Sequence, residues 1–400
     1  MNDSSGKEVR LGDVAVMTSG GTPPSGVAHF YGGGIPWVSI SDITRSGKYV
    51  TKTEKTLSVA GLVNSAAKLY ADGIVLYAMY ASLGECAIAV GQVSSSQAIL
   101  GINPGPRLHR DYLYYYLSSI KSSVRELGQH GTQANLNAGM VRRFSLRLPP
   151  LGQQRAIAEV LTDVDQLIST LERLIKKKQA IKEGMMQELL TGRTRLPGFS
   201  KRWREVLLGD VAVMTSGGTP PSGVAQFYGG GIPWVSISDI TRSGKYVTKT
   251  EKTLSAAGLI NSAAQLYADG IVLYAMYASL GECAIAVGQV SSSQAILGIN
   301  PGPRLHRDYL YYYLSFIKSS VRELGQHGTQ ANLNAGMVRR FTLRLPPLGE
   351  QRAIAVALED CDQETQLLRD RLAKTCAIKQ GMMQQLLTGR TRLPIAEVVA

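Results

Sequence analysis

An internal repeat constrains the fold of this chain more than any other feature. Residue n matches residue n+197 from Val9 to Pro197, so that Gly12 corresponds to Gly209 and Trp37 to Trp234. Repeats that stack into solenoids are about 20 to 50 residues long, and this unit is several times longer. The chain of 400 residues is therefore predicted to contain two copies of a complete domain unit.

The two copies have diverged unevenly. Residues 9–150 differ from residues 206–347 at 7 of 142 positions, whereas residues 151–193 differ from residues 348–390 at 18 of 43. The differences in the first part include Arg10/Leu207, His29/Gln226, Lys68/Gln265 and Ser119/Phe316. Because two nearly identical domains present nearly the same surface, we expect both to bind the same ligand.

The large segment, residues 9–150, predicts a mixed α/β domain with many loops. Short β-rich runs occur at Ile74–Tyr77, Cys86–Val90 and Ala98–Ile102, separated by stretches rich in Gly, Pro and Ser. Residues 111–127 have the apolar spacing of a helix, and Tyr114–Tyr116 are interpreted as core residues.

After Pro149 and Pro150 the pattern becomes that of one long helix. No proline occurs from Gln153 to Leu190, and apolar residues recur in alternating steps of four and three, which is typical of a coiled-coil seam. The seam residues are Ile157, Leu161, Val164, Ile168, Leu171 and Ile175 in the first copy, and Ile354, Leu358, Cys361, Leu368, Leu372, Ile378 and Met382 in the second, where Thr365 interrupts the seam. A helix of about 40 residues is about 60 Å long, too long for the interior of one small domain. We therefore expect each helix to pack along the other.

The order of the segments predicts how the helices pair. The first helix leaves the first domain and ends at the second, which is entered through residues 199–205, so the second helix must run back to pack on the first. The predicted fold class is α+β: two globular mixed α/β domains joined by an antiparallel coiled coil, with pseudo-two-fold symmetry. The predicted segments, alternately globular and helical, are residues 1–150, 151–195, 196–347 and 348–394. Two independent helical tails are the alternative, although each would expose an apolar seam.

Charge and cysteine content limit the class of partner and the compartment. The net charge of +13 and the pI of about 9.5 favour a polyanionic partner, because lysine and arginine displace counterions from phosphates. A generally basic soluble protein is the alternative. Four cysteines without a CxxC pair, a polar N-terminus and no run of about 18 apolar residues predict a reduced, cytoplasmic protein without a membrane span.

The motifs of common enzymes are missing from the sequence. There is no phosphate-binding loop, no dinucleotide fingerprint, no zinc-type His/Cys spacing and no nucleophile elbow. Residues 148–151 read LPPL, with leucine where an amino-methyltransferase motif needs a polar group to hold the target amine. His29 is glutamine in the second copy, and His109 is interpreted as a helix-start or surface residue. We therefore predict no catalytic residue, no metal and no cofactor in this chain.

Several loops of the large segment carry groups that can read DNA. Hydrogen-bonding side chains read base edges, amides suit adenine, and basic side chains bind phosphates. The candidate residues are Ser19, Thr22, Ser39, Ser41, Asp42, Arg45, Lys48, Tyr80, Ser82, Gln97, Thr132, Gln133 and Asn135, with the counterparts Ser216, Thr219, Ser236, Ser238, Asp239, Arg242, Lys245, Tyr277, Ser279, Gln294, Thr329, Gln330 and Asn332. Each also has a plainer interpretation as a turn, cap or core residue.

Several motifs resemble those of a known family. Residues 203–210 read WREVLLGD, residues 216–220 read SGGTP, and residues 228–240 read YGGGIPWVSISDI. These resemble the opening of a target recognition domain from the specificity subunits of type I restriction-modification systems. The first copy matches except at its start, where Gly6 and Lys7 stand in place of Trp203 and Arg204, and at Arg10, which corresponds to Leu207. The motifs LPPLGQQRAIA, LPPLGEQRAIA, MMQELLTGR and MMQQLLTGR resemble the helical spacers of the same family.

The resemblance implies a subunit without catalytic activity that binds double-stranded DNA and holds two methyltransferase (M) subunits. Restriction (R) subunits would complete the nuclease. S-adenosylmethionine, ATP and Mg²⁺ would then be bound by those partner subunits. In the family, each recognition domain reads one half of a split target, and the helices set the distance between the halves.

This chain departs from the family pattern, because family members usually carry two dissimilar recognition domains. Two nearly identical domains on antiparallel helices predict a target with one half-site repeated in inverted orientation. A standalone DNA-binding regulator, an enzyme with unrecognised chemistry and a coiled-coil adaptor without DNA contact are the alternatives.

Overall fold

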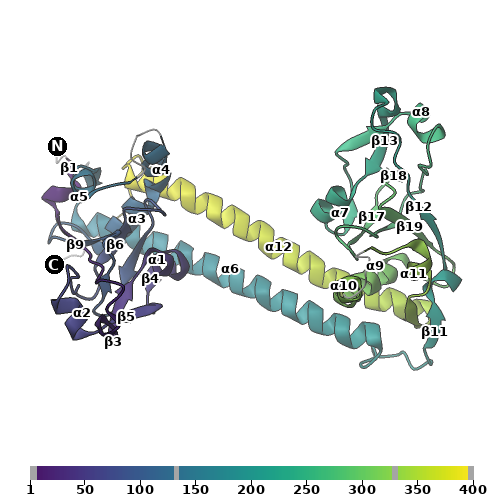
Figure 1. The fold of residues 1–400 in the computed structure, drawn as a ribbon, viewed down its shortest axis with the longest axis horizontal. Coiled ribbons are helices and arrows are strands. Elements are labelled where there is room, and N and C mark those ends of the chain that lie inside the picture. The colour runs from purple at the N-terminus through teal and green to yellow at the C-terminus, as the bar shows by residue number, and fades with distance from the viewer. Residues whose placement is uncertain (1–6, 130–134, 327–331, 395–400) are drawn as a thin grey trace. The chain divides into compact units, whose positions relative to one another are not determined.

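The computed structural model describes residues 7–129, 135–326 and 332–394 (Figure 1). The chain divides into two compact units, of which unit 1 combines the residues up to Glu172 with those from Asp370 onward, and unit 2 is Arg173–Arg369. Each unit thus contains one globular domain and half of each long helix. The segments predicted from the sequence treat each helix as one spacer.

The globular domain of unit 1 contains ten strands and five helices in its described residues. They are β1 (Lys7–Arg10), β2 (Ala15–Ser19), β3 (Tyr31–Val38), α1 (Ile40–Ser46), β4 (Tyr49–Val50), β5 (Lys55–Leu57), α2 (Val59–Val63), β6 (Val75–Ala78), β7 (Cys86–Ala89), β8 (Ser94–Ser95), β9 (Ile99–Pro104), α3 (Arg110–Ser119), α4 (Lys121–Gln129), α5 (Ala138–Arg142) and β10 (Ser145–Leu148). The three strands predicted from the sequence correspond to β6, β7 and β9.

Unit 2 repeats these elements in the same order. They are β11 (Arg204–Leu207), β12 (Ala212–Ser216), β13 (Tyr228–Val235), α7 (Ile237–Ser243), β14 (Tyr246–Val247), β15 (Lys252–Leu254), α8 (Ala256–Ile260), β16 (Val272–Ala275), β17 (Cys283–Ala286), β18 (Ser291–Ser292), β19 (Ile296–Pro301), α9 (Arg307–Phe316), α10 (Lys318–Gln326), α11 (Ala335–Arg339) and β20 (Thr342–Leu345). The long helices are α6 (Leu151–Thr191) and α12 (Leu348–Leu387).

Each globular domain is built on a five-stranded sheet. In unit 1 the strand order is β2-β9-β6-β7-β4, antiparallel except for the parallel pair β4 and β7. A three-stranded sheet, β5-β3-β8, and the pair β1-β10 complete the domain. Every residue of β6 and β7 is buried, as expected for central strands with both faces covered.

Helix α3 covers the sheet and supplies aromatic core residues. Tyr115 and Tyr116 are buried, which confirms their interpretation as core residues, whereas Tyr114 is half-buried; Tyr112 is also buried. The hydroxyls of Tyr112 and Tyr116 donate to the carbonyl oxygens of Arg147 and Ser145, at 2.8 and 2.7 Å. Because each buried hydroxyl has an acceptor, burial of these rings is stabilising.

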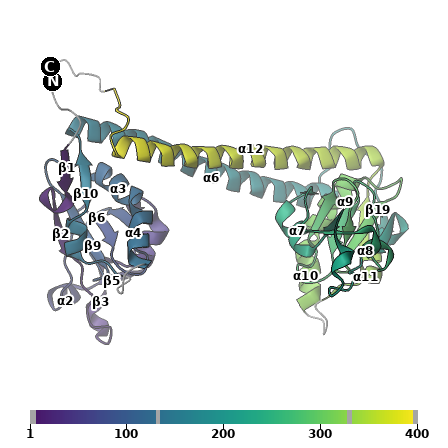
Figure 2. The same cartoon turned by 90° about the horizontal axis from the view of Figure 1, so that it is seen from above.

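The halves of α6 and α12 lie side by side in each unit and run antiparallel (Figures 1 and 2). In unit 2, Lys182 pairs with Asp362 at 2.5 Å, and the Sγ of Cys361 lies 3.5 Å from the Sδ of Met185. Residue numbers rise along one helix as they fall along the other. The predicted antiparallel pairing is therefore confirmed within each unit.

The seam of α12 differs from its prediction. Ile378 is 58% exposed, so its assignment to the seam is wrong. Thr365 and Thr375 are buried instead, and each hydroxyl donates to the carbonyl oxygen four residues earlier, at 2.8 Å. The steps of four and three therefore continue through Leu372, Thr375 and Lys379. Because its hydroxyl is hydrogen-bonded within the helix, a threonine can occupy a buried seam position that an apolar pattern would assign to a residue such as isoleucine.

A polar junction joins the globular domain of unit 1 to both helix halves. It consists of Lys48, Tyr115, Thr162, Asp165 and Lys379. The Tyr115 hydroxyl donates to Asp165 at 2.7 Å, Lys48 donates to Thr162 at 2.8 Å, and Asp165 pairs with Lys379 at 2.6 Å. These bonds fix the domain to α6 and α6 to α12.

Unit 2 has the same polar junction with one substitution, in which Glu359 replaces Thr162. Tyr312 donates to both Glu359 and Asp362 at 2.9 Å, and Lys245 is hydrogen-bonded to Glu359. Burial would lower the pKa of Lys245, but Glu359 and Asp308 raise it above its ordinary value. Lys245 is therefore held as a cation by two carboxylates.

A buried ion pair fixes the chain where α6 passes into the second domain. Glu350 is fully buried and accepts hydrogen bonds from Arg195 at 2.5 and 2.7 Å and from the indole of Trp203 at 3.0 Å. These three donors satisfy the carboxylate, as a buried charge requires. None of the helices in the described part of the chain combines the length and apolarity needed to span a bilayer.

Candidate nucleic-acid interface

Hydrogen bonds donated by backbone amides bring four separate loops of unit 1 together. The amide of Gln97 donates to the Thr22 hydroxyl at 3.5 Å, and the amide of Met79 donates to the Ala98 carbonyl at 2.8 Å. The amide of Leu136 donates to the Met79 carbonyl at 2.9 Å. The loops around residues 22, 80, 97 and 136 are thus neighbours, although they lie far apart in the sequence.

Exposed polar side chains lie on these loops and at the adjoining end of β2. We call this set the recognition surface; in unit 1 it consists of Ser19, Thr22, Tyr80, Gln97 and Asn135, all exposed. Its counterparts in unit 2 are Ser216, Thr219, Tyr277, Gln294 and Asn332, all exposed except the half-exposed Tyr277. Hydroxyl and amide groups of this kind can donate to and accept from base edges, and a tyrosine ring can pack against them.

Close backbone contacts set the position of the glycine-rich loop. A Cβ at Gly20 would lie 2.3 Å from the Ser95 Oγ, and one at Gly21 would lie 2.2 Å from the backbone of Ala66. The indole of Trp37 donates to the Gly21 carbonyl at 3.1 Å. Only glycine fits at these two positions, so the backbone of the loop that carries Thr22 is held in a fixed position.

A strained turn carries the aromatic member of the recognition surface. Ala81 has a φ of 54° and its counterpart Ala278 a φ of 51°, in the left-handed region that alanine rarely adopts. The amide of Gly84 donates to the Ala78 carbonyl at 3.2 Å and closes the turn. A left-handed alanine costs about 1 to 2 kcal/mol, and such strain clusters at functional sites.

Asp42 and Asp239 are removed from the candidates because they have structural roles. Asp42 is 4% exposed and accepts from the Ser39 amide at 2.9 Å and from the Glu54 amide at 3.1 Å, which caps α1. Burial would raise the pKa of Asp239, but hydrogen bonds from Ser236 hold it below its ordinary value. These carboxylates are therefore internal acceptors rather than groups that face a DNA groove.

Lys48 and Lys245 are also removed, because they face the long helices. The side chain of Lys48 is 10% exposed, pairs with Asp111 at 3.0 Å and donates to Thr162. Lys245 pairs with Asp308 at 3.0 Å. A phosphate contact would require each lysine to leave a carboxylate partner in a partly buried site, which is costly.

The remaining candidates fall into three groups. Ser41 and Arg45 are exposed beside Ser39, although Arg45 pairs with Glu54 at 2.8 Å, which raises its pKa. Ser82 is half-exposed beside Ala81. Their counterparts Ser236, Ser238, Arg242 and Ser279 repeat these placements. Thr132, Gln133, Thr329 and Gln330 lie outside the described residues.

Lys68 is a candidate that sequence reasoning missed. It is exposed and lies two residues after Ala66, whose backbone contacts Gly21. Its counterpart is Gln265, so only unit 1 has a cation at this position beside the recognition surface. The sequence feature that could have identified Lys68 is the Lys68/Gln265 difference itself, because the two globular domains differ at only 7 positions.

Burial shifts the pKa of two further polar side chains, His109 and Cys86. His109 is the N-cap residue of α3, as predicted, and burial lowers its pKa. The Cys86 thiol is buried, which raises its pKa to about 12 and keeps it protonated. In the described ranges no three His, Cys, Asp or Glu side chains are grouped as metal ligands.

A family model for the type I restriction modification DNA specificity domain matches residues 4–183 and 200–375. The chain belongs to this family. It is 23% identical over 408 residues to the type I restriction enzyme MjaVIII specificity subunit of Methanocaldococcus jannaschii, covering 96% of this chain and 92% of that protein. It is 20% identical over 280 residues to the EcoR124I/EcoR124II specificity subunit of Escherichia coli, covering 67% of each.

Solved structures of the family share the fold. The HsdS subunit from Thermoanaerobacter tengcongensis covers 96% of this chain with 97% of its own, at 20% identity and a TM-score of 0.51. A chain from a study of the assembly and conformational transition of a type I restriction-modification system covers 95% with 97% of its own, at 22% identity and a TM-score of 0.65. The predicted architecture of two mixed α/β domains and two long helices is confirmed.

Proposed function

We propose that this family member reads a split DNA target in which one half-site is repeated in inverted orientation. The observation that carries the proposal is the identity of the two recognition surfaces. Each residue of the set in unit 1 is the same residue in unit 2. The bond from Gln294 to Thr219, at 3.4 Å, also repeats the one between Gln97 and Thr22.

Direct readout depends on the donor and acceptor pattern that the protein presents. Two surfaces with the same pattern select the same bases, and antiparallel helix halves support opposite orientation of the half-sites. The net charge of +13 supplies attraction to the phosphate backbone.

The chain is proposed to act as a scaffold rather than as an enzyme. It would hold two methyltransferase subunits, which bind S-adenosylmethionine and methylate adenine, and restriction subunits that use ATP and Mg²⁺. These subunits would supply the catalysis, and this chain the DNA contacts. We also propose that the complex works in the cytoplasm, where its DNA substrate is found.

The test is to co-express the chain with its methyltransferase subunit and to map methylated adenines across a genome. The expected result is a split inverted repeat with one half-site. Two unrelated half-sites would contradict the inverted repeat. DNA binding by an intact complex that never methylates would instead indicate a standalone regulator.

Matched glycine variants sharpen this test. Gly21→Ala and Gly218→Ala each introduce a Cβ about 2.2 Å from backbone atoms of the neighbouring loop, in unit 1 and unit 2 respectively. If both units read the same half-site, each variant alone lowers methylation of the same target. Gly26→Ala is the control, because nothing lies within 4 Å of its Cβ position.

A further inference from the structure

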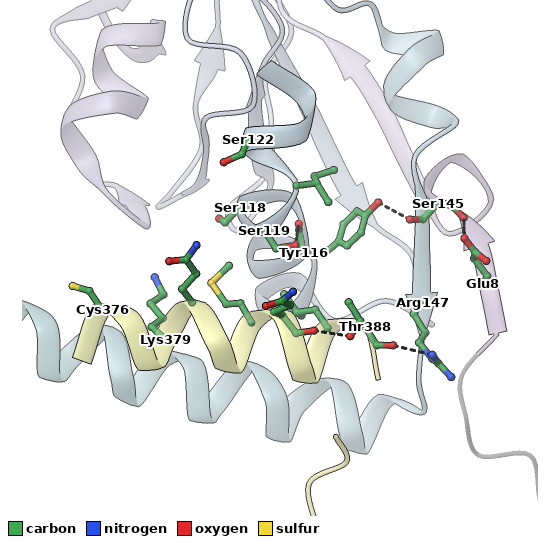
Figure 3. Close-up of a pocket in the computed structure, with 15 residues that line it drawn as sticks. Glu8, Tyr116, Ser118, Ser119, Ser122, Ser145, Arg147, Cys376, Lys379 and Thr388 are labelled. Carbon is green, nitrogen blue, oxygen red and sulfur yellow. Dashed lines mark hydrogen bonds between the residues drawn. The ribbon is translucent and has the colours of Figure 1, made fainter. Parts of the chain in front are cut away.

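A groove of about 970 Å³ lies in unit 1 beside the C-terminal half of α12 (Figure 3). Apolar side chains, including Met383 and Leu387, line it together with hydroxyl groups such as those of Ser118 and Ser119. Figure 3 shows residues of α12 on one side of the groove and residues of α3 on the other. Its lining is amphipathic and belongs entirely to unit 1.

The charged residues of this groove already have partners within the chain. Glu8 accepts from the Ser145 hydroxyl at 2.6 Å, and Arg147 donates to the Thr388 carbonyl at 2.8 Å. Lys379 pairs with Asp165 at 2.6 Å. Such a groove has little excess charge for a phosphate backbone, whereas mixed apolar and hydroxyl surface suits a protein segment.

The equivalent groove of unit 2 is divided. Two smaller pockets, of about 480 and 580 Å³, stand in its place, and Phe316 lines both. Phe316 replaces Ser119 and is one of the 7 differences between the globular domains. Its ring is half-buried and packs against the domain core, so it is anchored in this position.

We propose that the groove of unit 1 binds a segment of the methyltransferase subunit, and that Phe316 weakens the same docking in unit 2. The inference rests on the proposed function, because it takes that subunit as the partner. A segment that lies along the undivided groove meets the Phe316 ring in unit 2 and must displace it or bind incompletely. The two methyltransferase subunits therefore bind in order, with unit 1 occupied first.

The experiment titrates the full chain with the purified methyltransferase subunit and follows it by native mass spectrometry and calorimetry. The wild-type chain is expected to show two binding steps whose Kd values differ about tenfold, the ratio that corresponds to about 1.4 kcal/mol. Phe316→Ser should bring the ratio of the two Kd values to the statistical ratio expected for two equal sites. Ser119→Phe should weaken the stronger step to the level of the weaker one.

The variants are suited to the comparison because each introduces the residue that the other domain already carries. Ile260→Val is the matched control. It exchanges another of the 7 differences, at a position that is 80% exposed and outside the groove, and should leave both steps unchanged. Equal steps in the wild-type chain, or unequal steps that Phe316→Ser does not change, would overturn the inference alone. A chain that binds no methyltransferase subunit would overturn the proposed function and this inference together.

Discussion

Asp165 on α6 and Lys379 on α12 form an ion pair of 2.6 Å, and Asp362 and Lys182 repeat it at 2.5 Å in the other unit. The two aspartates occupy equivalent positions of the repeat, 197 residues apart, and so do the two lysines. In both units the aspartate also accepts a hydrogen bond from a tyrosine of the globular domain, Tyr115 or Tyr312. One side chain thus fixes the domain and the register of the helices together.

Asp165→Asn should lower the free energy of unfolding of unit 1. The substitution removes the charge that pairs with Lys379 while keeping a similar volume. The expected loss is about 1 to 2 kcal/mol, since both side chains are about one-quarter exposed and hydrogen bonds to charged groups are stronger than neutral ones. The urea midpoint measures it, with the exposed Asp163→Asn as control. Equal midpoints for the two variants would contradict a role for the pair.

Acid should destabilise the protein through Asp308. Burial would raise the pKa of this carboxyl, but its hydrogen bond and ion pair with Lys245 hold it below the ordinary value. A carboxyl with a lowered pKa stabilises the fold above its unfolded pKa of about 3.9, and this contribution is lost as the pH falls through the folded pKa. Asp308→Asn should therefore reduce stability near neutral pH and flatten its decline between about pH 5 and about pH 3. Asp360→Asn, at an exposed position, should leave that decline as in the wild type.

Gly21→Ala should weaken DNA binding more than it lowers stability. The added Cβ would lie 2.2 Å from the backbone of Ala66, so the loop that carries Thr22 must move. A misplaced base-reading group costs about 1 to 3 kcal/mol of discrimination. Fluorescence anisotropy with cognate and scrambled duplexes measures this on the assembled complex. If Gly26→Ala reduced discrimination equally, the fixed position of the loop would not be the cause.

Lys68→Gln should reduce the salt dependence of DNA binding. Removing one phosphate contact lowers the slope of log K against log salt by about 1 and weakens cognate and scrambled duplexes alike. Gln265→Lys should raise the slope by a similar amount in unit 2. Lys177→Gln, at an exposed position of α6, is the control. An unchanged slope in both variants would show that Lys68 does not contact DNA.

The sequence predicted the features that depend on local pattern. The repeat, the two long helices, the strands β6, β7 and β9 and the buried tyrosines follow from periodicity and from the identity of the two copies. The seam prediction is wrong at Ile378, because the spacing of four and three residues falls on Thr375 and Lys379, neither of which is apolar. A threonine that bonds to its own helix, or a lysine with a carboxylate partner, fits a seam position that an apolar pattern does not reveal.

The sequence by itself determined that this chain contains one recognition domain twice, because identical segments fold alike. Only the tertiary structure decided which loop residues lie together and which basic residues are already paired. Lys48 lies in a loop that predicts DNA contact, yet it bonds to Thr162, 114 residues later. The effect of Phe316 on its groove could not be predicted from the sequence either, because α9 and α6 come together only in the folded unit. Contacts between distant residues depend on how elements pack, and neither composition nor periodicity records that packing.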